Sequence, residues 1–257
     1  MTYCVGIKLN AGLVFLSDSR TNAGVDNMLS AGNLSISQSV REILQVEQLK
    51  ENGSGDAITI WNATSMFDAC RVLGQAVRHV YDRDAKALQH AGVEFNVNLI
   101  FGGQIRGEGM RLFQVYSAGN FIEATAETPY FQIGEYKYGK PVLDRVLTPE
   151  TGLDEAAKCA LVSMDSTMKS NLSVGPPLDL VVYEANRFET DRVVCIDMQN
   201  PYFRMLHSSW GQKLREVFDS LDHPVWDSSH TETPLLTAAS GRAKPLKKIT
   251  RPDERLI

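Results

Sequence analysis

The chain has 257 residues, of which 43% are hydrophobic and 22% charged, and its formal net charge of −5 disfavours a dedicated nucleic-acid binder. It shows neither a secretion signal nor an apolar run long enough to cross a membrane, and its four cysteines form no CxxC pair. We therefore expect a cytoplasmic protein with reduced cysteines and with neither nucleic-acid nor membrane partners.

The first residues predict a β-hairpin. Apolar side chains alternate over residues 2–9, a turn signal follows at residues 10–12, and residues 13–17 predict the returning strand. Residues 20–28 are polar and contain Gly24, which indicates a loop.

Helices and further strands are expected along the rest of the folded region. Apolar residues recur on one face over 34–51 and over 64–91, where the stripe includes Leu73, Val77 and Val80. The remaining predicted elements are strands at 94–105, 110–116, 121–124 and 130–133, helices at 139–147 and 156–170, strands at 178–183 and 192–196, and a helix at 201–222.

This order of elements predicts the fold class. Strands and helices come in segregated runs, which favours an α+β layered sandwich over a doubly wound sheet. The apolar periodicity fades after residue 222, and Ser, Thr, Pro, Gly and then basic residues follow. We expect one folded domain over 1–222 and a flexible basic tail over 223–257.

Several sequence patterns do not indicate a metal site, a phosphate-binding loop or a binding segment. The five histidines lie at no recognised metal spacing, and the glycine-rich stretch at 101–109 matches neither phosphate-loop pattern. A hairpin turn is the better interpretation of that stretch, and a solvated tail is the better interpretation of the basic C-terminal run.

The N-terminus is the most informative place in the chain. Thr2 is small, so removal of Met1 is expected, and this would leave a threonine with a free α-amine. The amine, with a pKa of about 7.7–8.0, can take the proton of its own hydroxyl. The predicted hairpin would hold Thr2 in a sheet and return Asp18 beside it, where a carboxylate can orient a cation. Taken alone, Thr2 is also simply a common second residue.

The sequence resembles a known family at several points. Thr-Tyr-Cys-Val-Gly-Ile-Lys-Leu from residue 2 and Ser-Asp-Ser-Arg-Thr-Asn-Ala-Gly from residue 17 resemble the start of a proteasome β-type subunit. More narrowly, the chain resembles the Anbu family of bacterial proteasome-like proteins, also called ancestral β-subunits. The likeness returns at residues 30–34, 133–141 and 173–179 and extends to about residue 222.

The resemblance implies a four-layer αββα sandwich, an N-terminal-nucleophile hydrolase and a role in proteolysis without a metal or organic cofactor. It implies that Thr2 is the nucleophile, that Asp18 lies in the active site, and that the backbone N–H of Gly32 forms the oxyanion hole. Ser173 matches a serine that helps to fix the N-terminus. Glu135 and Ser170 stand where many β-subunits place a supporting serine and a supporting aspartate, so those two roles do not transfer.

The resemblance also implies self-assembly into a homo-oligomeric ring or spiral that acts on peptide or protein substrates, with an unknown unfoldase as a further partner. The expected contacts lie in the helical layers, where the helices at 34–51 and 64–91 offer apolar stripes.

One departure from the family concerns its catalytic lysine. No lysine occurs between Lys8 and Lys50. Compared with the family, a segment about as long as a β-hairpin is missing between Asn27 and Met28. Three functions stay open: a threonine peptidase, a weak or silent self-assembling subunit, and an N-terminal-nucleophile amidase that acts on small amides. The missing lysine favours the second, and the proteasome-like motifs outside the active site disfavour the third.

Overall fold

The computed structural model describes residues 2–18, 59–60 and 62–224 of the chain. The predicted helix over 34–51, the residue Gly32 and the predicted tail from residue 225 onward lie outside these residues. The chain divides into one unit over Met1–His207 and another over Ser208–Ile257.

A five-stranded antiparallel sheet carries the N-terminus. Its strands lie in the order β6-β1-β2-β7-β8, and they span Tyr3–Lys8 (β1), Gly12–Asp18 (β2), Tyr130–Gly134 (β6), Leu178–Glu184 (β7) and Arg192–Ile196 (β8). The predicted opening hairpin is confirmed, since β1 pairs with β2 in a register that places Cys4 opposite Ser17. Strand β1 is therefore an inner strand, with β2 on one side and β6 on the other.

A second antiparallel sheet has three strands in the order β3-β4-β5. They span Leu99–Gly103 (β3), Arg111–Val115 (β4) and Phe121–Glu123 (β5). The predicted strand over 94–105 is thus shorter than expected, because residues 93–98 have no regular secondary structure. The two sheets approach closely at Gly6, where an added Cβ would lie 2.6 Å from a side-chain carbon of Ile100.

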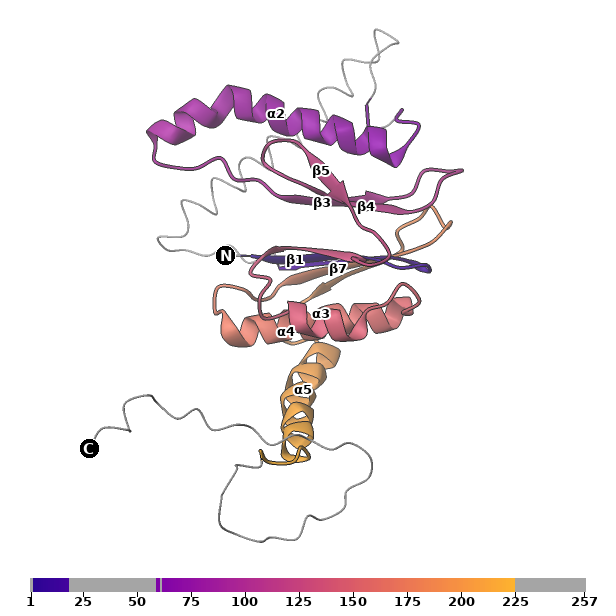
Figure 1. Cartoon of the computed structure of the whole chain (residues 1–257), viewed down its shortest axis with the longest axis vertical. Coiled ribbons are helices and arrows are strands. Elements are labelled where there is room, and N and C mark those ends of the chain that lie inside the picture. The colour runs from indigo at the N-terminus through magenta and orange to yellow at the C-terminus, as the bar shows by residue number, and fades with distance from the viewer. Residues whose placement is uncertain (1, 19–58, 61, 225–257) are drawn as a thin grey trace, which may run out of the picture. The chain divides into compact units, whose positions relative to one another are not determined.

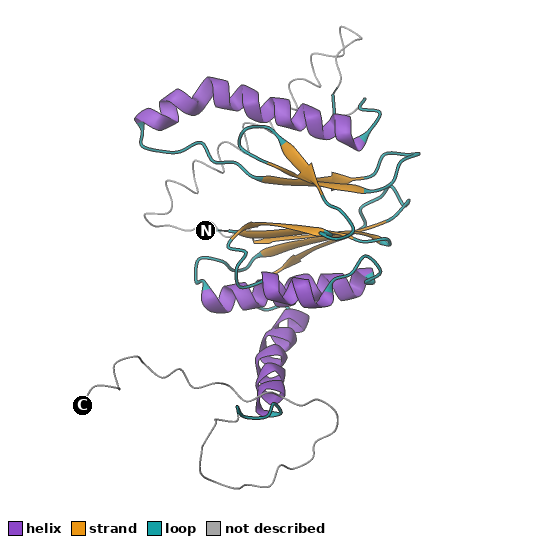
Figure 2. Ribbon diagram, in the orientation of Figure 1, coloured by secondary structure: helices purple, strands orange, loops and turns teal. Residues whose placement is uncertain are grey.

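Helices cover the outer face of each sheet, so the unit over Met1–His207 has four layers (Figures 1 and 2). Helix α2 (Met66–His90) lies over the smaller sheet, and α3 (Lys140–Val146) and α4 (Leu153–Ser170) lie over the larger one. This is the predicted α+β, αββα arrangement. Helix α5 (Pro201–Asp219) follows β8, and none of the described helices is both long and apolar enough to cross a membrane.

The apolar stripe of α2 belongs to the core of the subunit. Helix α2 begins after Ser65, whose hydroxyl caps it by accepting the N–H of Asp68 at 3.0 Å. Its stripe, which includes Val77, packs in one buried cluster with Phe113 and Val115 of β4. We expected this stripe to serve subunit assembly, and for this helix that prediction is wrong, because the stripe is already covered by the subunit's own sheet.

Candidate active site

Thr2 and Asp18 lie side by side at one end of the larger sheet. Because β1 and β2 are joined by a tight turn and pair antiparallel, the end of β2 returns to the start of β1. The hydroxyl of Thr2 donates a short hydrogen bond to Oδ1 of Asp18. The backbone N–H of Tyr3 donates to the same oxygen at 2.9 Å. As predicted, the hairpin brings Asp18 beside Thr2.

Asp18 is buried, with only 7% of the residue exposed. Burial raises its pKa above the ordinary value, and the hydrogen bonds from Thr2 and Tyr3, together with the N–H of Gly175, offset part of that rise. Among the described residues, its second oxygen, Oδ2, has no hydrogen-bond partner. A buried carboxylate with one unsatisfied oxygen is costly in a folded protein, and a nearby cation or hydrogen-bond donor would stabilise it.

Cys4 is the other nucleophilic side chain near Thr2. Its Sγ lies 3.8 Å from Oγ1 of Thr2. Burial raises the pKa of the Cys4 thiol to about 11, and the nearby charge of Asp18 adds to the rise. The thiol is therefore neutral at physiological pH, and a neutral thiol is a poor nucleophile. Of the two side chains, Thr2 is the better candidate.

The end of β6 holds Thr2 from the opposite side. The backbone N–H of Glu135 donates to the carbonyl oxygen of Thr2 at 2.9 Å. Gly134 makes this approach possible because its φ is +82°, and a Cβ built there would lie 1.9 Å from that same oxygen. Only glycine fits such a left-handed, crowded position.

Ser173 connects to this support through two other residues. Its hydroxyl donates to Oδ1 of Asn171 at 2.6 Å, and the side-chain N–H of Asn171 donates to Glu135 at 3.1 Å. Glu135 is 6% exposed and also pairs with Lys137 at 3.6 Å. The structure thus places Ser173 in a chain of contacts that ends at the backbone of Thr2. Ser170 is the exposed last residue of α4.

A buried polar cluster lies behind the start of β1, and no pattern in the sequence predicts it. The hydroxyl of Tyr3 lies 2.6 Å from the hydroxyl of Ser163 on α4. The side-chain amide of Gln132 on β6 donates to the Tyr3 hydroxyl at 2.6 Å. Gly139 closes the cluster, since a Cβ there would lie 2.3 Å from Oγ of Ser163. Burial raises the pKa of Tyr3 to about 12. Tyr3 therefore ties the residue next to Thr2 to β6 and α4 together.

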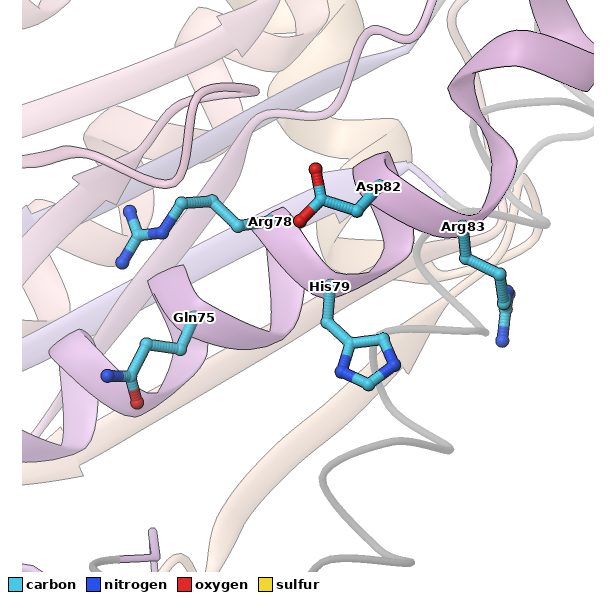
Figure 3. Close-up of a pocket in the computed structure, with 5 residues that line it drawn as sticks. All are labelled: Gln75, Arg78, His79, Asp82 and Arg83. Atoms are coloured by element: carbon cyan, nitrogen blue, oxygen red, sulfur yellow. The ribbon is translucent and has the colours of Figure 1, made fainter.

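A separate hollow on α2 is a poor candidate for chemistry. Its lining side chains all come from this one helix: Gln75, Arg78, His79, Asp82 and Arg83 (Figure 3). Arg78 donates to the carbonyl oxygen of Gly119 at 2.9 Å, and Arg83 pairs with Asp84 at 2.6 Å. Both arginines thus already have structural partners, and the described residues contain no group of three His, Cys, Asp or Glu side chains arranged to hold a metal.

Comparisons with known proteins identify the family. Residues 68–183 match the family described as proteasome subunit. The solved structure of Anbu (ancestral beta-subunit) from Yersinia bercovieri is 45% identical, with a TM-score of 0.75 and coverage of 86% of this chain and 98% of that chain. The chain belongs to the Anbu family of proteasome-like proteins.

Two further Anbu structures agree with this assignment. Anbu from Hyphomicrobium sp. strain MC1 is 45% identical with a TM-score of 0.76, and the match covers 86% of this chain and 99% of that one. The helical assembly of the Anbu complex from Pseudomonas aeruginosa is 39% identical with a TM-score of 0.77, over 87% and 98% of the two chains. The comparison with curated proteins gave no match. These matches show the family and the fold of the chain.

Proposed function

We propose that this Anbu protein is a self-assembling, proteasome-like threonine peptidase subunit whose nucleophile is Thr2 after removal of Met1. The observation that carries this proposal is the hydrogen bond from the Thr2 hydroxyl to the buried carboxylate of Asp18. The thiol of Cys4, the nearest alternative nucleophile, is neutral and therefore poorly reactive.

The proposed reaction needs only groups of the protein and water. The free α-amine of Thr2 takes the proton from Oγ1, and Oγ1 attacks the carbonyl carbon of a peptide bond. The N–H of Gly32 stabilises the oxyanion, the protonated amine returns a proton to the leaving amine, and an ester to Thr2 remains. Water then hydrolyses that ester and restores the hydroxyl. Asp18 keeps the Thr2 hydroxyl in place, and Ser173 supports the N-terminus through Asn171 and Glu135.

The peptidase activity of this chain should nevertheless be weak. The sequence has no lysine between Lys8 and Lys50, so the cation that would favour the alkoxide form of Thr2 is missing from that stretch. A group of this kind contributes about 10²- to 10⁴-fold to the rate.

A second candidate function follows from the same observation. If the missing lysine abolishes the chemistry, the chain is a silent subunit that keeps the fold and its contacts with other copies. Self-assembly is common to both candidates, and it is supported by the similarity to an Anbu protein that forms a helical assembly.

Hydrolysis of short fluorogenic peptides tests the proposal. The purified chain, its Thr2→Ala variant and a form with a lysine-bearing hairpin inserted after Asn27 should be compared at equal concentration. We expect slow hydrolysis that Thr2→Ala abolishes and that the inserted hairpin increases. Hydrolysis that survives in Thr2→Ala would contradict the role of Thr2, and no hydrolysis in any form would favour the silent subunit.

A further inference from the structure

A row of four side chains crosses the larger sheet beside the proposed nucleophile. Cys4 on β1 is paired with Ser17 on β2. Ser17 is paired with Asp179 on β7, and Asp179 is paired with Cys195 on β8. Directly opposite residues of antiparallel strands project their side chains from the same face of the sheet. The four side chains therefore form one line across one face.

This row lies on the face of the sheet that carries the Thr2 hydroxyl. The Sγ of Cys4, the first member of the row, is 3.8 Å from Oγ1 of Thr2. The same face looks towards the smaller sheet, because Gly6, two residues further along β1, would bring an added Cβ within 2.6 Å of Ile100 on β3. Asp179 lies two strands away from Cys4, so about 10 Å separates their backbones across the sheet.

The half of the row on β7 and β8 is exposed. Cys4 and Ser17 are partly buried, whereas Asp179 and Cys195 are both exposed. Val193, which shares this face because it is two residues from Cys195 on β8, is 59% exposed. Within the described part of the chain, Asp179 forms no ion pair with a Lys, Arg or His side chain. An unpaired carboxylate therefore stands on an exposed part of the face that carries the nucleophile.

A second carboxylate adds to the negative charge at this end of the sheet. The pKa of the Cys195 thiol is raised, first by loss of hydration and then by the charge of Asp179, a hydrogen bond with Asp179 and the charge of Asp197. Asp197 directly follows β8, which ends opposite the start of β7, and the start of β7 pairs with Asp18. The three carboxyl groups thus lie at the end of the sheet that holds Thr2.

We infer that Asp179 selects peptide substrates in which the residue whose carbonyl group Thr2 attacks is lysine or arginine. The inference rests on the proposed function and specifies its substrate class. A carboxylate two strands from the nucleophile is beyond the reach of short side chains, whereas the long side chains of lysine and arginine can extend to it. A charge-assisted hydrogen bond to Asp179 would then hold the substrate chain along the row, and Asp197 adds to the charge that attracts it.

Binding of short peptides to the Thr2→Ala variant tests the inference without any cleavage. Labelled peptides of the sequence Leu-Leu-Arg and Leu-Leu-citrulline form a matched pair, because citrulline has the length of arginine but no charge. We expect the arginine peptide to bind about three- to tenfold more tightly, with a preference that added salt reduces. Equal dissociation constants, measured by fluorescence anisotropy, would overturn the inference.

Asp179→Asn tests the assignment to this carboxylate. In the Thr2→Ala background it should bring the two dissociation constants together. In the otherwise unaltered protein it should lower the ratio of kcat/KM for the arginine peptide to kcat/KM for the citrulline peptide, with fluorogenic forms of both. Glu184→Gln is the matched control, because Glu184 is an exposed carboxylate at the opposite end of the same strand. It should leave both preferences unchanged.

The inference and the proposed function fail in different ways. An undiminished preference for arginine in Asp179→Asn would overturn the inference, and hydrolysis that Thr2→Ala abolishes would still support the proposed nucleophile. A preference for arginine in binding that Asp179→Asn removes, together with no hydrolysis of either peptide, would instead support the inference and contradict the proposed peptidase activity.

Discussion

The backbone N–H of Tyr3 donates a hydrogen bond of 2.9 Å to the carboxylate of Asp18. Asp18 thus accepts hydrogen bonds from Thr2, the proposed nucleophile, and from Tyr3, the next residue. The side chain of Tyr3 is meanwhile fixed on the other face of β1, in the polar cluster with Ser163 and Gln132. One residue therefore couples the geometry of the site to the packing of α4 and β6.

Replacement of Tyr3 by Phe should destabilise the fold at neutral pH. The variant keeps the ring but leaves the buried hydroxyl of Ser163, which is 0% exposed, without its Tyr3 partner. The expected loss is about 1–3 kcal/mol in the free energy of unfolding, measured by urea denaturation. An unchanged unfolding midpoint would show that the cluster does not contribute to stability.

The same pair of proteins should show a pH effect. Because burial raises the pKa of Tyr3 to about 12 from 10.0, the unfolded chain loses the phenol proton first. The stability that Tyr3 contributes is complete below pH 10 and declines as the pH rises towards 12, by up to about 3 kcal/mol. The difference in unfolding free energy between the unaltered protein and Tyr3→Phe should therefore shrink over this range. A difference that stays constant would contradict the burial of an un-ionised Tyr3.

Gly139→Ala should destabilise the protein by crowding the same cluster. The new Cβ would lie 2.3 Å from Oγ of Ser163 and 2.7 Å from the Tyr3 hydroxyl, and overpacking of this kind costs about 1–3 kcal/mol. Gly109→Ala is the matched control, because no atom lies within 4 Å of its added Cβ and its backbone is not in the left-handed region. Thermal unfolding of both variants gives the comparison, and equal melting temperatures would contradict the close packing at Gly139.

Asp18→Asn should change how stability depends on pH. Burial raises the pKa of Asp18 above the ordinary value of 3.8. The neutral carboxyl group therefore contributes stability that is complete below pH 3.8 and is lost as the pH rises through the pKa of the folded state. The variant cannot ionise. Its stability relative to the unaltered protein should therefore improve between acidic and neutral pH, as measured by urea denaturation at each pH. A relative stability that declines over that range would mean that a cation satisfies the carboxylate.

Much of the fold could be predicted because its signals are local. The alternation over residues 2–9 and the turn at 10–12 were enough to place Asp18 beside Thr2. The helical stripe through Val77 was also evident, but the sequence could not show that β4 already covers it. The polar cluster was beyond prediction, because Tyr3 and Ser163 are 160 residues apart in the chain and no periodicity links them. The role of Gly134 likewise depends on a backbone angle that only the pairing of β6 with β1 imposes.

The proposed function of Thr2 as an N-terminal nucleophile requires a free α-amine on Thr2. Intact-protein mass spectrometry of the purified chain measures that condition directly. We expect a mass lower than that of the full sequence by one methionine residue, with Thr2 as the first residue in the N-terminal peptide. A mass that retains Met1 would contradict it, because the nitrogen of Thr2 would then be an amide and could not act as the base.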